Sequence, residues 1–148
     1  MNVTLKQING LAMAAVADSG HWVTTDGPKK FGGHSAGPRP MELLLMSLAS
    51  CTGMDVVSIL SKKRVKLDDF SLEVEARQAQ EHPKVFTEIK IHYIFEGDNI
   101  RSTDVERAIE LSESKYCSAS TMLKASASIS HDYEIIQRNG RPDDSPSD

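Results

Sequence analysis

Hydrophobic and polar residues alternate in the first part of the chain, and this pattern predicts short strands. Residues 3–8 and 11–17 flank Asn9-Gly10, a two-residue hairpin signal, and residues 21–25 give a third strand. Residues 26–40 are rich in glycine and proline and are expected to form a loop.

Three later strands are predicted by the same alternation. Their apolar faces are Phe70, Leu72, Val74 and Ala76, then Val85, Thr87, Ile89, Ile91, Tyr93 and Phe95, and finally Ala127, Ile129, His131, Tyr133 and Ile135. The intervening positions are mostly charged or polar, including Glu73, Lys90 and Asp132. We therefore expect a sheet with one packed face and one face in water.

A long helix is predicted from Pro40, a residue suited to the first helical turn, to about Lys63. It is apolar almost all round, with Leu43, Leu44, Leu45, Met46, Leu48, Met54, Val56, Val57, Ile59 and Leu60. A surface helix shows one apolar stripe, so this helix must be buried on most sides. The rest of the chain offers little helix to cover it, and we expect an obligate homodimer with this helix at or near the interface.

A second helix is predicted from the capping-box sequence Thr103-Asp104-Val105-Glu106, and Cys117 lies near its end. Its apolar face is Val105, Ala108, Ile109, Ser112 and Tyr116. The order of the elements indicates an α+β fold in a single domain over residues 1–137. Residues 138–148 are predicted to be a disordered polar tail.

Charge and composition exclude several classes of function. The 148 residues carry a net charge of −4, which does not suit a nucleic-acid partner, and Lys62-Lys63-Arg64 complements the end of the long helix. The N-terminus lacks the pattern of a signal peptide, and no uninterrupted apolar stretch approaches the roughly 18 residues of a membrane span. We expect a cytoplasmic protein with no membrane partner, in which two cysteines are free thiols or a transient redox pair.

Cys51 lies in the middle of the long helix, where the helix dipole cannot be its main activator. It shares a helical face with Leu44, Ser47, Leu48 and Asp55, and a carboxylate disfavours a thiolate beside it. Cys51 is therefore either a small buried hydrophobe or a reactive thiol. The helix-interior Gly53 makes room for a ligand or for a crossing helix. A second thiol, Cys117, permits a nucleophile and a resolving partner.

Two cysteines could instead bind a metal. Zinc needs about four ligands, yet the sequence has no C-x2-C motif and no pair of histidines at H-x3–5-H spacing. Only His34 and His131 could plausibly join the thiols. The sequence therefore predicts no metal site.

The segment GPRPMELLLMSLASCTGMDVVSIL, followed by two strands, a helix and SKYCSASTML before SASISHDYEI, resembles the OsmC/Ohr family. These are the osmotically induced and organic hydroperoxide resistance proteins. The likeness extends from about Gly37 to Ile136. It implies a two-layer α+β subunit in an intertwined homodimer, with long central helices packed against antiparallel sheets and active sites at the dimer interface.

The resemblance also implies a chemistry: the thiol-dependent reduction of hydroperoxides in the response to oxidative stress. Cys51 would be the peroxidatic cysteine and Cys117 the resolving cysteine, and an external dithiol would restore the pair. No metal or organic cofactor is implied. Apolar walls from Leu44, Leu48 and Met54 would favour organic hydroperoxides over hydrogen peroxide.

This chain departs from the family pattern at the residues that activate the thiol. Organic hydroperoxide resistance proteins use an arginine from the N-terminal strands, held by a glutamate directly after the helix-starting proline. Here Met41 follows Pro40, and no arginine precedes Arg39, so Arg39, Glu42 and Asp55 are the candidates for support. The chain is closer to the OsmC-like branch, and the alternative function is a weakly catalytic or non-catalytic dimer that binds a small molecule or acts as a scaffold.

Overall fold

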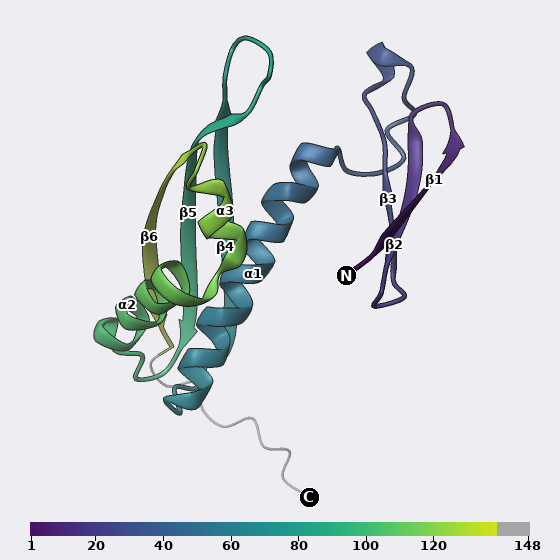
Figure 1. Cartoon of the computed structure of the whole chain (residues 1–148). Helices are drawn as coiled ribbons and strands as arrows, with labels where there is room; N and C mark the ends of the chain where they lie inside the picture. The colour runs from purple at the N-terminus through teal and green to yellow at the C-terminus, as the bar shows by residue number, and fades with distance from the viewer. Residues whose placement is uncertain (139–148) are drawn as a thin grey trace, which may run out of the picture. The chain divides into compact units, whose positions relative to one another are not determined.

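The computed structural model describes residues 1–138, so the predicted polar tail lies, apart from Arg138, outside the described residues. The chain divides into two compact units, one of residues 1–46 and one that begins at Ser47 (Figure 1). The helix α1 (Pro40–Lys62) contains the boundary between them. The prediction of one domain over residues 1–137 stays a prediction.

The first unit is built around a three-stranded antiparallel sheet in the order β1-β2-β3. Its elements are β1 (Val3–Asn9), β2 (Ala12–Ala17), β3 (Trp22–Thr25) and the short 3-10 helix η1 (Lys29–Phe31). Asn9 pairs with Ala12, so the predicted hairpin turns at Gly10-Leu11, one residue later than Asn9-Gly10. Gly10 supplies the positive φ of +55° that this turn needs.

Asp26 organises the loop that follows β3. Its buried carboxylate accepts hydrogen bonds from the backbone N–H groups of Gly27 at 2.7 Å, His34 at 2.8 Å and Ala36 at 3.0 Å. These backbone donors, that of Ala36 above all, hold the pKa of Asp26 below its usual value.

The second unit contains a sheet in the order β4-β5-β6. Its strands are β4 (Asp69–Gln78), β5 (Phe86–Gly97) and β6 (Ser128–Gln137). β4 and β5 are antiparallel, whereas β5 and β6 are parallel, so this sheet is mixed and not wholly antiparallel as expected. A parallel neighbour needs a long crossover connection, which the helices between β5 and β6 provide. The α+β class is confirmed.

One face of the second sheet is buried, as the alternation predicts. Leu72 pairs with Tyr93, and Tyr93 pairs on its other side with Tyr133, so the apolar positions of the three strands share a face. The prediction is wrong for Val85 and Thr87, which are exposed. An irregularity in the register near Gln78 shifts the pairing, and Phe86 is buried instead.

Helices cover this face of the sheet (Figure 1). Besides α1 they are α2 (Ser102–Leu111), the π-helical turn η2 (Ser112–Tyr116) and α3 (Ser118–Leu123). Leu48, Val56 and Leu60 of α1 are fully buried, but Met54 and Val57 are exposed. In one chain, therefore, α1 is covered on one side only, and the all-round burial predicted from its composition is not reached.

Gly53 lies on the side of α1 that faces β4. A Cβ atom here would be 3.1 Å from Cδ2 of Leu72 and 3.4 Å from Cε1 of Phe70. Within one chain the glycine therefore makes room for side chains of the sheet, and the predicted ligand or crossing helix beside it stays a prediction.

The second helical region differs from its prediction at both ends. α2 begins at Ser102 and Thr103 makes no capping hydrogen bond, so the capping-box prediction is wrong. Asp104 instead contacts Arg101 at 2.7 Å and Lys63 at 2.8 Å. The predicted single helix changes to the π-helical turn at Ser112, a distortion frequent at functional sites.

Among the described helices, α1 alone has the length and apolar composition that could cross a membrane. The core helix of a globular domain passes the same test, and the buried side of α1 packs on the second unit's sheet. Length and composition alone therefore do not assign α1 to a membrane.

Candidate active site

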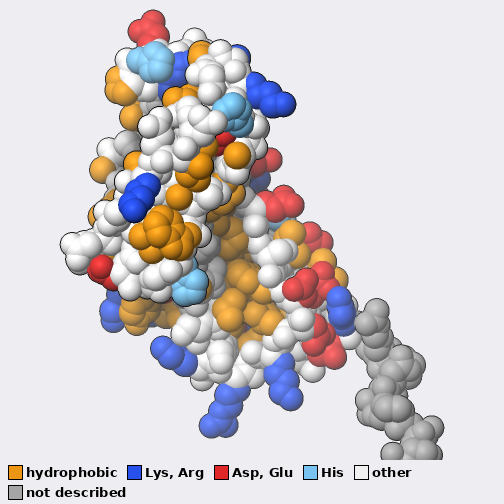
Figure 2. Space-filling view, turned by 90° about the vertical axis from the view of Figure 1, so that its right-hand side faces the viewer, with side chains coloured by type: hydrophobic (Ala, Val, Ile, Leu, Met, Phe, Trp, Pro, Cys, Tyr) orange, Lys and Arg blue, Asp and Glu red, His pale blue; other side chains and the backbone are white. Residues whose placement is uncertain are grey.

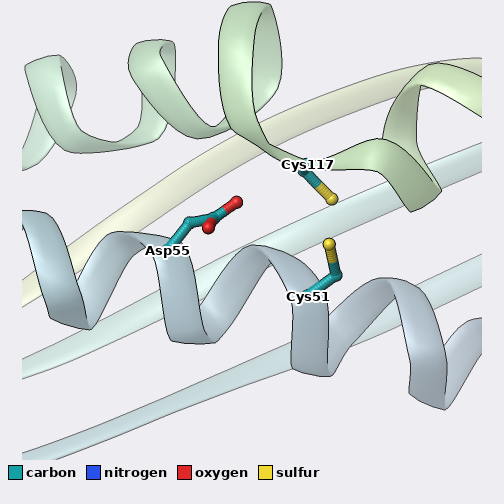
Figure 3. A group of neighbouring side chains, drawn as sticks. All are labelled: Cys51, Asp55 and Cys117. Carbon is teal, nitrogen blue, oxygen red and sulfur yellow. The ribbon is translucent and has the colours of Figure 1, made fainter.

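Cys51 projects from the middle of α1 toward the segment that joins η2 to α3 (Figure 3). Its side chain is half-buried and therefore open in part to solvent. Asp55 follows one helical turn later and points to the same side (Figure 3). The hydroxyl of Ser112 donates a hydrogen bond of 3.1 Å to Oδ2 of Asp55 and fixes the carboxylate from the opposite element.

Cys117 occupies the extended N-cap position of α3, directly after the π-helical turn. Its backbone N–H donates to the carbonyl of Ser112 at 2.8 Å. Its sulfur accepts hydrogen bonds of 3.3 Å from the hydroxyl of Thr52 and of 3.3 Å from the backbone N–H of Ser120. The side chain is only 1% exposed.

The environment acts on the Cys117 thiol in two opposing ways. Burial raises the pKa of Cys117, because a thiolate is poorly solvated there. The hydrogen bond from Thr52 works in the other direction, because a donor stabilises the thiolate. The net result is a pKa above the ordinary value, so Cys117 is held as a thiol.

The two thiols and one carboxylate converge on a single point. Both cysteines are free, and Sγ of Cys51, Sγ of Cys117 and an oxygen of Asp55 all lie within 4.8 Å of one another (Figure 3). The fold thus brings together residues that are far apart in the sequence, and the catalytic roles predicted for the cysteines stay a prediction. The same three atoms could also hold a metal ion.

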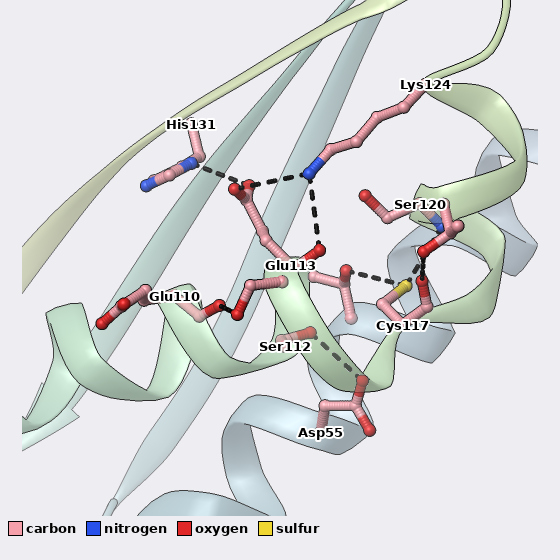
Figure 4. Close-up of polar contacts among 11 residues, drawn as sticks. Asp55, Glu110, Ser112, Glu113, Cys117, Ser120, Lys124 and His131 are labelled. Atoms are coloured by element: carbon pink, nitrogen blue, oxygen red, sulfur yellow. Dashed lines mark hydrogen bonds and ion pairs between the residues drawn. The ribbon is translucent and has the colours of Figure 1, made fainter.

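A second polar cluster lies beside Cys117 (Figure 4). Glu113 of the π-helical turn is within 2.7 Å of Nδ1 of His131 and 3.9 Å of Nζ of Lys124. Tyr93 is fully buried. Burial raises the pKa of Tyr93, so it stays a neutral phenol.

Arg39 and Glu42, predicted to support the thiols, contact each other at the start of α1. Arg39 is tied to Glu42: its backbone N–H donates to Oε2 at 2.9 Å, and its Nε lies 4.0 Å from Oε1. Glu42 precedes Cys51 by two and a half helical turns. Asp55 lies beside the thiols, and the contribution of Arg39, Glu42 and Asp55 to the chemistry stays a prediction.

The predicted substrate walls are divided between different environments. Leu48 is fully buried, whereas Leu44 is 40% and Met54 is 69% exposed. Met54 lines an apolar groove between α1 and β4, together with residues that include Gly53, Val57, Phe70 and Leu72. The contribution of these side chains to a substrate site stays a prediction.

Sequence reasoning did not assign a site role to Thr52, Ser112, Ser120, Tyr93 or Glu113. Thr52 carries a local signal, since it directly follows Cys51, and Ser120 lies three residues after Cys117. Ser112 and Tyr93 have no such signal in the sequence. Ser112 reaches the site because of the π-helical turn, and Tyr93 because of the register of β5.

Comparisons with known proteins agree with this fold. The family described as OsmC-like protein matches residues 32–132. Protein YhfA of Escherichia coli is 37% identical over 136 residues, which cover 92% of this chain and 98% of that one. A hypothetical protein from Aquifex aeolicus has a similar structure, with a TM-score of 0.77, 33% identity, and coverage of 92% of this chain and 97% of that one.

A structure named as an organic hydroperoxide resistance protein OsmC, from Legionella pneumophila, is a more distant likeness. Its TM-score is 0.67 at 15% identity, over 90% of this chain and 97% of that chain. At that identity the similarity concerns the fold alone.

Proposed function

Because the chain belongs to the OsmC-like protein family, we propose that it is a thiol peroxidase that reduces hydroperoxides. The observation that carries the proposal is the pair of free thiols, Cys51 and Cys117, whose sulfurs lie within 4.8 Å of each other. The Legionella pneumophila structure, which shares the fold, is named as an organic hydroperoxide resistance protein.

The difference in burial between the two cysteines supports a division of roles. Cys51 is half-buried and accessible to a small substrate, whereas Cys117 is 1% exposed and held by Thr52 and Ser120. Cys51 is therefore the peroxidatic residue and Cys117 the resolving one.

The reaction proceeds in three balanced steps. The Cys51 thiolate attacks the O–O bond and takes one oxygen, and the other leaves as an alkoxide that gains a proton and departs as an alcohol. The Cys117 thiol then attacks the sulfenic acid, forming a disulfide and releasing water. An external dithiol reduces the disulfide by exchange and restores both thiols. The residues themselves perform the chemistry, so the proposal needs no cofactor.

Organic hydroperoxides are the preferred substrates in this proposal. In a dimer whose active sites lie at the interface, Leu44 and Met54, which are exposed in one chain, offer apolar contacts for the organic part of such a molecule. Hydrogen peroxide has no apolar part and gains nothing from those contacts.

A homodimer accounts for the large apolar side chains that one chain leaves in solvent. Figure 2 shows hydrophobic side chains open to solvent on one face of the molecule. In the first unit Leu5 is 59% and Trp22 58% exposed, and in the second unit Met54 is 69% exposed. A second copy that covers these residues, in a cytoplasmic dimer, would remove this apolar surface from water.

The alternative function, a weakly catalytic or non-catalytic dimer that binds a small molecule or acts as a scaffold, has one specific observation in its favour. The charged group that faces both sulfurs is the carboxylate of Asp55, whereas a cation is what stabilises an attacking thiolate. No arginine, lysine or histidine forms an ion pair with Asp55 in the described part of the chain. The rate at which the protein consumes hydroperoxide therefore distinguishes the peroxidase from the non-catalytic alternative.

The chemistry of the thiols can be tested directly by intact-mass measurement. After one equivalent of cumene hydroperoxide, the reduced wild type is expected to lose two hydrogens as the disulfide forms, whereas Cys117→Ser gains oxygen on Cys51. Thermal unfolding of both proteins checks that the variant is folded. If both cysteines of the wild type stay reduced, the proposed function is wrong.

A further inference from the structure

We infer that Cys51, Asp55 and Cys117 form a binding site for a thiophilic divalent metal ion such as Zn²⁺. The inference goes beyond the hydroperoxide chemistry and does not depend on it, because it concerns the reduced protein without any substrate. Cys51 and Asp55 come from one face of α1, and Cys117 comes from the start of α3 on the opposite side (Figure 3).

The ligand atoms are already close to the spacing that a tetrahedral ion requires. Zinc binds thiolate sulfur at about 2.3 Å and carboxylate oxygen at about 2.0–2.2 Å, so ligands of one ion lie roughly 3.5–3.8 Å apart. Here the three atoms all lie within 4.8 Å of one another, which requires a contraction of about 1 Å at most. Changes in side-chain torsion of Cys51 and Asp55 can supply this, since neither side chain is fully buried.

The three ligands are oriented by neighbours that are not themselves ligands. Ser112 donates to one oxygen of Asp55 at 3.1 Å, which leaves the other free to bind an ion. Thr52 and the backbone N–H of Ser120 hold the sulfur of Cys117 from two sides. Such supporting hydrogen bonds orient ligands and raise metal affinity in known sites.

The charge of the site also favours a cation. Other partly buried carboxylates of the second unit have basic partners: Asp104 contacts Lys63 and Arg101, and Glu113 contacts His131. Within residues 1–138 Asp55 has no ion pair and instead faces two sulfurs. A divalent cation would supply the missing positive charge.

The ligand set selects the class of ion. Two sulfurs suit zinc and similar thiophilic ions, whereas Mg²⁺ and Ca²⁺ need more ligands, all of them oxygen. Binding of Zn²⁺ to the reduced site releases two protons, one from each thiol, and leaves a fourth position for water. A bound ion occupies both thiols, so neither is then free to attack a hydroperoxide.

The sequence did not indicate this site because its ligands do not follow a familiar metal-binding motif. Cys51 and Asp55 are one helical turn apart, and Cys117 follows much later in the chain. The site exists only because the turn at residues 112–116 directs Cys117 back toward α1.

The reduced full-length protein can be titrated with Co²⁺ and then with Zn²⁺ against a chromophoric chelator. We expect one ion per chain and a thiolate-to-Co²⁺ charge-transfer band that is lost in Cys51→Ser and Cys117→Ser. Asp55→Asn should keep both thiols and weaken Zn²⁺ affinity by at least about tenfold, the smallest loss typical even of residues that only support a ligand. The matched control Asp132→Asn, which changes a carboxylate paired with Lys90 on the polar face of the sheet, should bind Zn²⁺ as the wild type does.

Thermal unfolding of each variant checks that it is folded. The inference is overturned if the wild type gives no charge-transfer band, or if a folded Asp55→Asn binds Zn²⁺ as tightly as the wild type. No hydroperoxide enters the titration, so its failure is distinguishable from failure of the proposed peroxidase.

Discussion

The hydroxyl of Thr52 donates a hydrogen bond to the sulfur of Cys117 across 3.3 Å, linking α1 to the start of α3. This bond opposes the burial that raises the pKa of Cys117. Thr52→Val removes the donor and keeps the shape, so we expect the pKa of Cys117 to rise further above its ordinary value. The pH dependence of the ultraviolet absorbance of the thiolate, in a Cys51→Ser background where Cys117 is the remaining cysteine, measures it.

Thr52→Ser is the matched control, because serine keeps a hydroxyl in the same place. The pH dependence of its thiolate absorbance should stay near that of the Cys51→Ser parent. An unchanged profile in Thr52→Val would show that the hydrogen bond does not stabilise the Cys117 thiolate.

Asp104 should make stability depend on pH in the acid range. Hydrogen bonds from Lys63 and then Arg101 lower the pKa of Asp104 from its ordinary value of 3.8. A lowered folded-state pKa stabilises the fold above that ordinary value, and the contribution is lost as the pH falls through the lowered one. The urea midpoint of the wild type should exceed that of Asp104→Asn at neutral pH, and the difference should shrink as the pH falls below 3.8.

Lys63→Met provides the corresponding control from the other side of the ion pair. The difference between wild type and Lys63→Met should shrink over the same acid range. If the difference in urea midpoint between the wild type and Asp104→Asn does not change with pH, the role given to the Asp104 carboxylate is contradicted.

Gly53 is expected to tolerate alanine but not a larger residue. Alanine gains up to about 1 kcal/mol in helix propensity, while its Cβ would lie 3.1 Å from Cδ2 of Leu72, a side chain that borders the groove and can move slightly. The free energy of unfolding should therefore change by less than about 1 kcal/mol in Gly53→Ala. Gly53→Val should lose about 1–3 kcal/mol through overpacking, measured by urea unfolding. Equal stability of the two variants would contradict the packing described here.

The apolar side chains left in solvent predict a homodimer. Sedimentation should give about twice the chain mass of 16.3 kDa. Met54→Glu places a charge on the 69% exposed apolar position of α1 and should produce monomers or aggregates. Glu134→Lys, on the polar face of β6, is the control and should remain dimeric. A wild type that sediments as a monomer at micromolar concentration would contradict the proposal.

The sequence predicted those elements whose pattern is strong over many residues. The long helix, the alternating strands and the apolar face that includes Ile91 and Tyr93 agree with the structure, because side chains alternate strictly along a strand. The pairing of Phe86 with Gln78 could not be predicted, because a bulge depends on the partner strand.

The candidate site was predicted only in part, because it too depends on contacts between segments that are distant in the sequence. Resemblance to a family pointed to both cysteines, and helical periodicity placed Asp55 on the face of Cys51. The π-helical turn that carries Ser112 and positions Cys117 has no sequence pattern comparable to a capping box. Direct contacts such as Thr52 to Cys117 depend on how α1 and α3 pack, which local sequence does not determine.

The central claim is that Cys51 and Cys117 turn over hydroperoxides. Its most direct test is steady-state consumption of cumene hydroperoxide and hydrogen peroxide by the reduced protein with a dithiol reductant, beside Cys51→Ser and Cys117→Ser. We predict rapid turnover by the wild type, faster with cumene hydroperoxide, and its loss in Cys51→Ser. Consumption by the wild type no faster than by free dithiol, with both cysteines still reduced, would contradict the claim and favour the non-catalytic alternative.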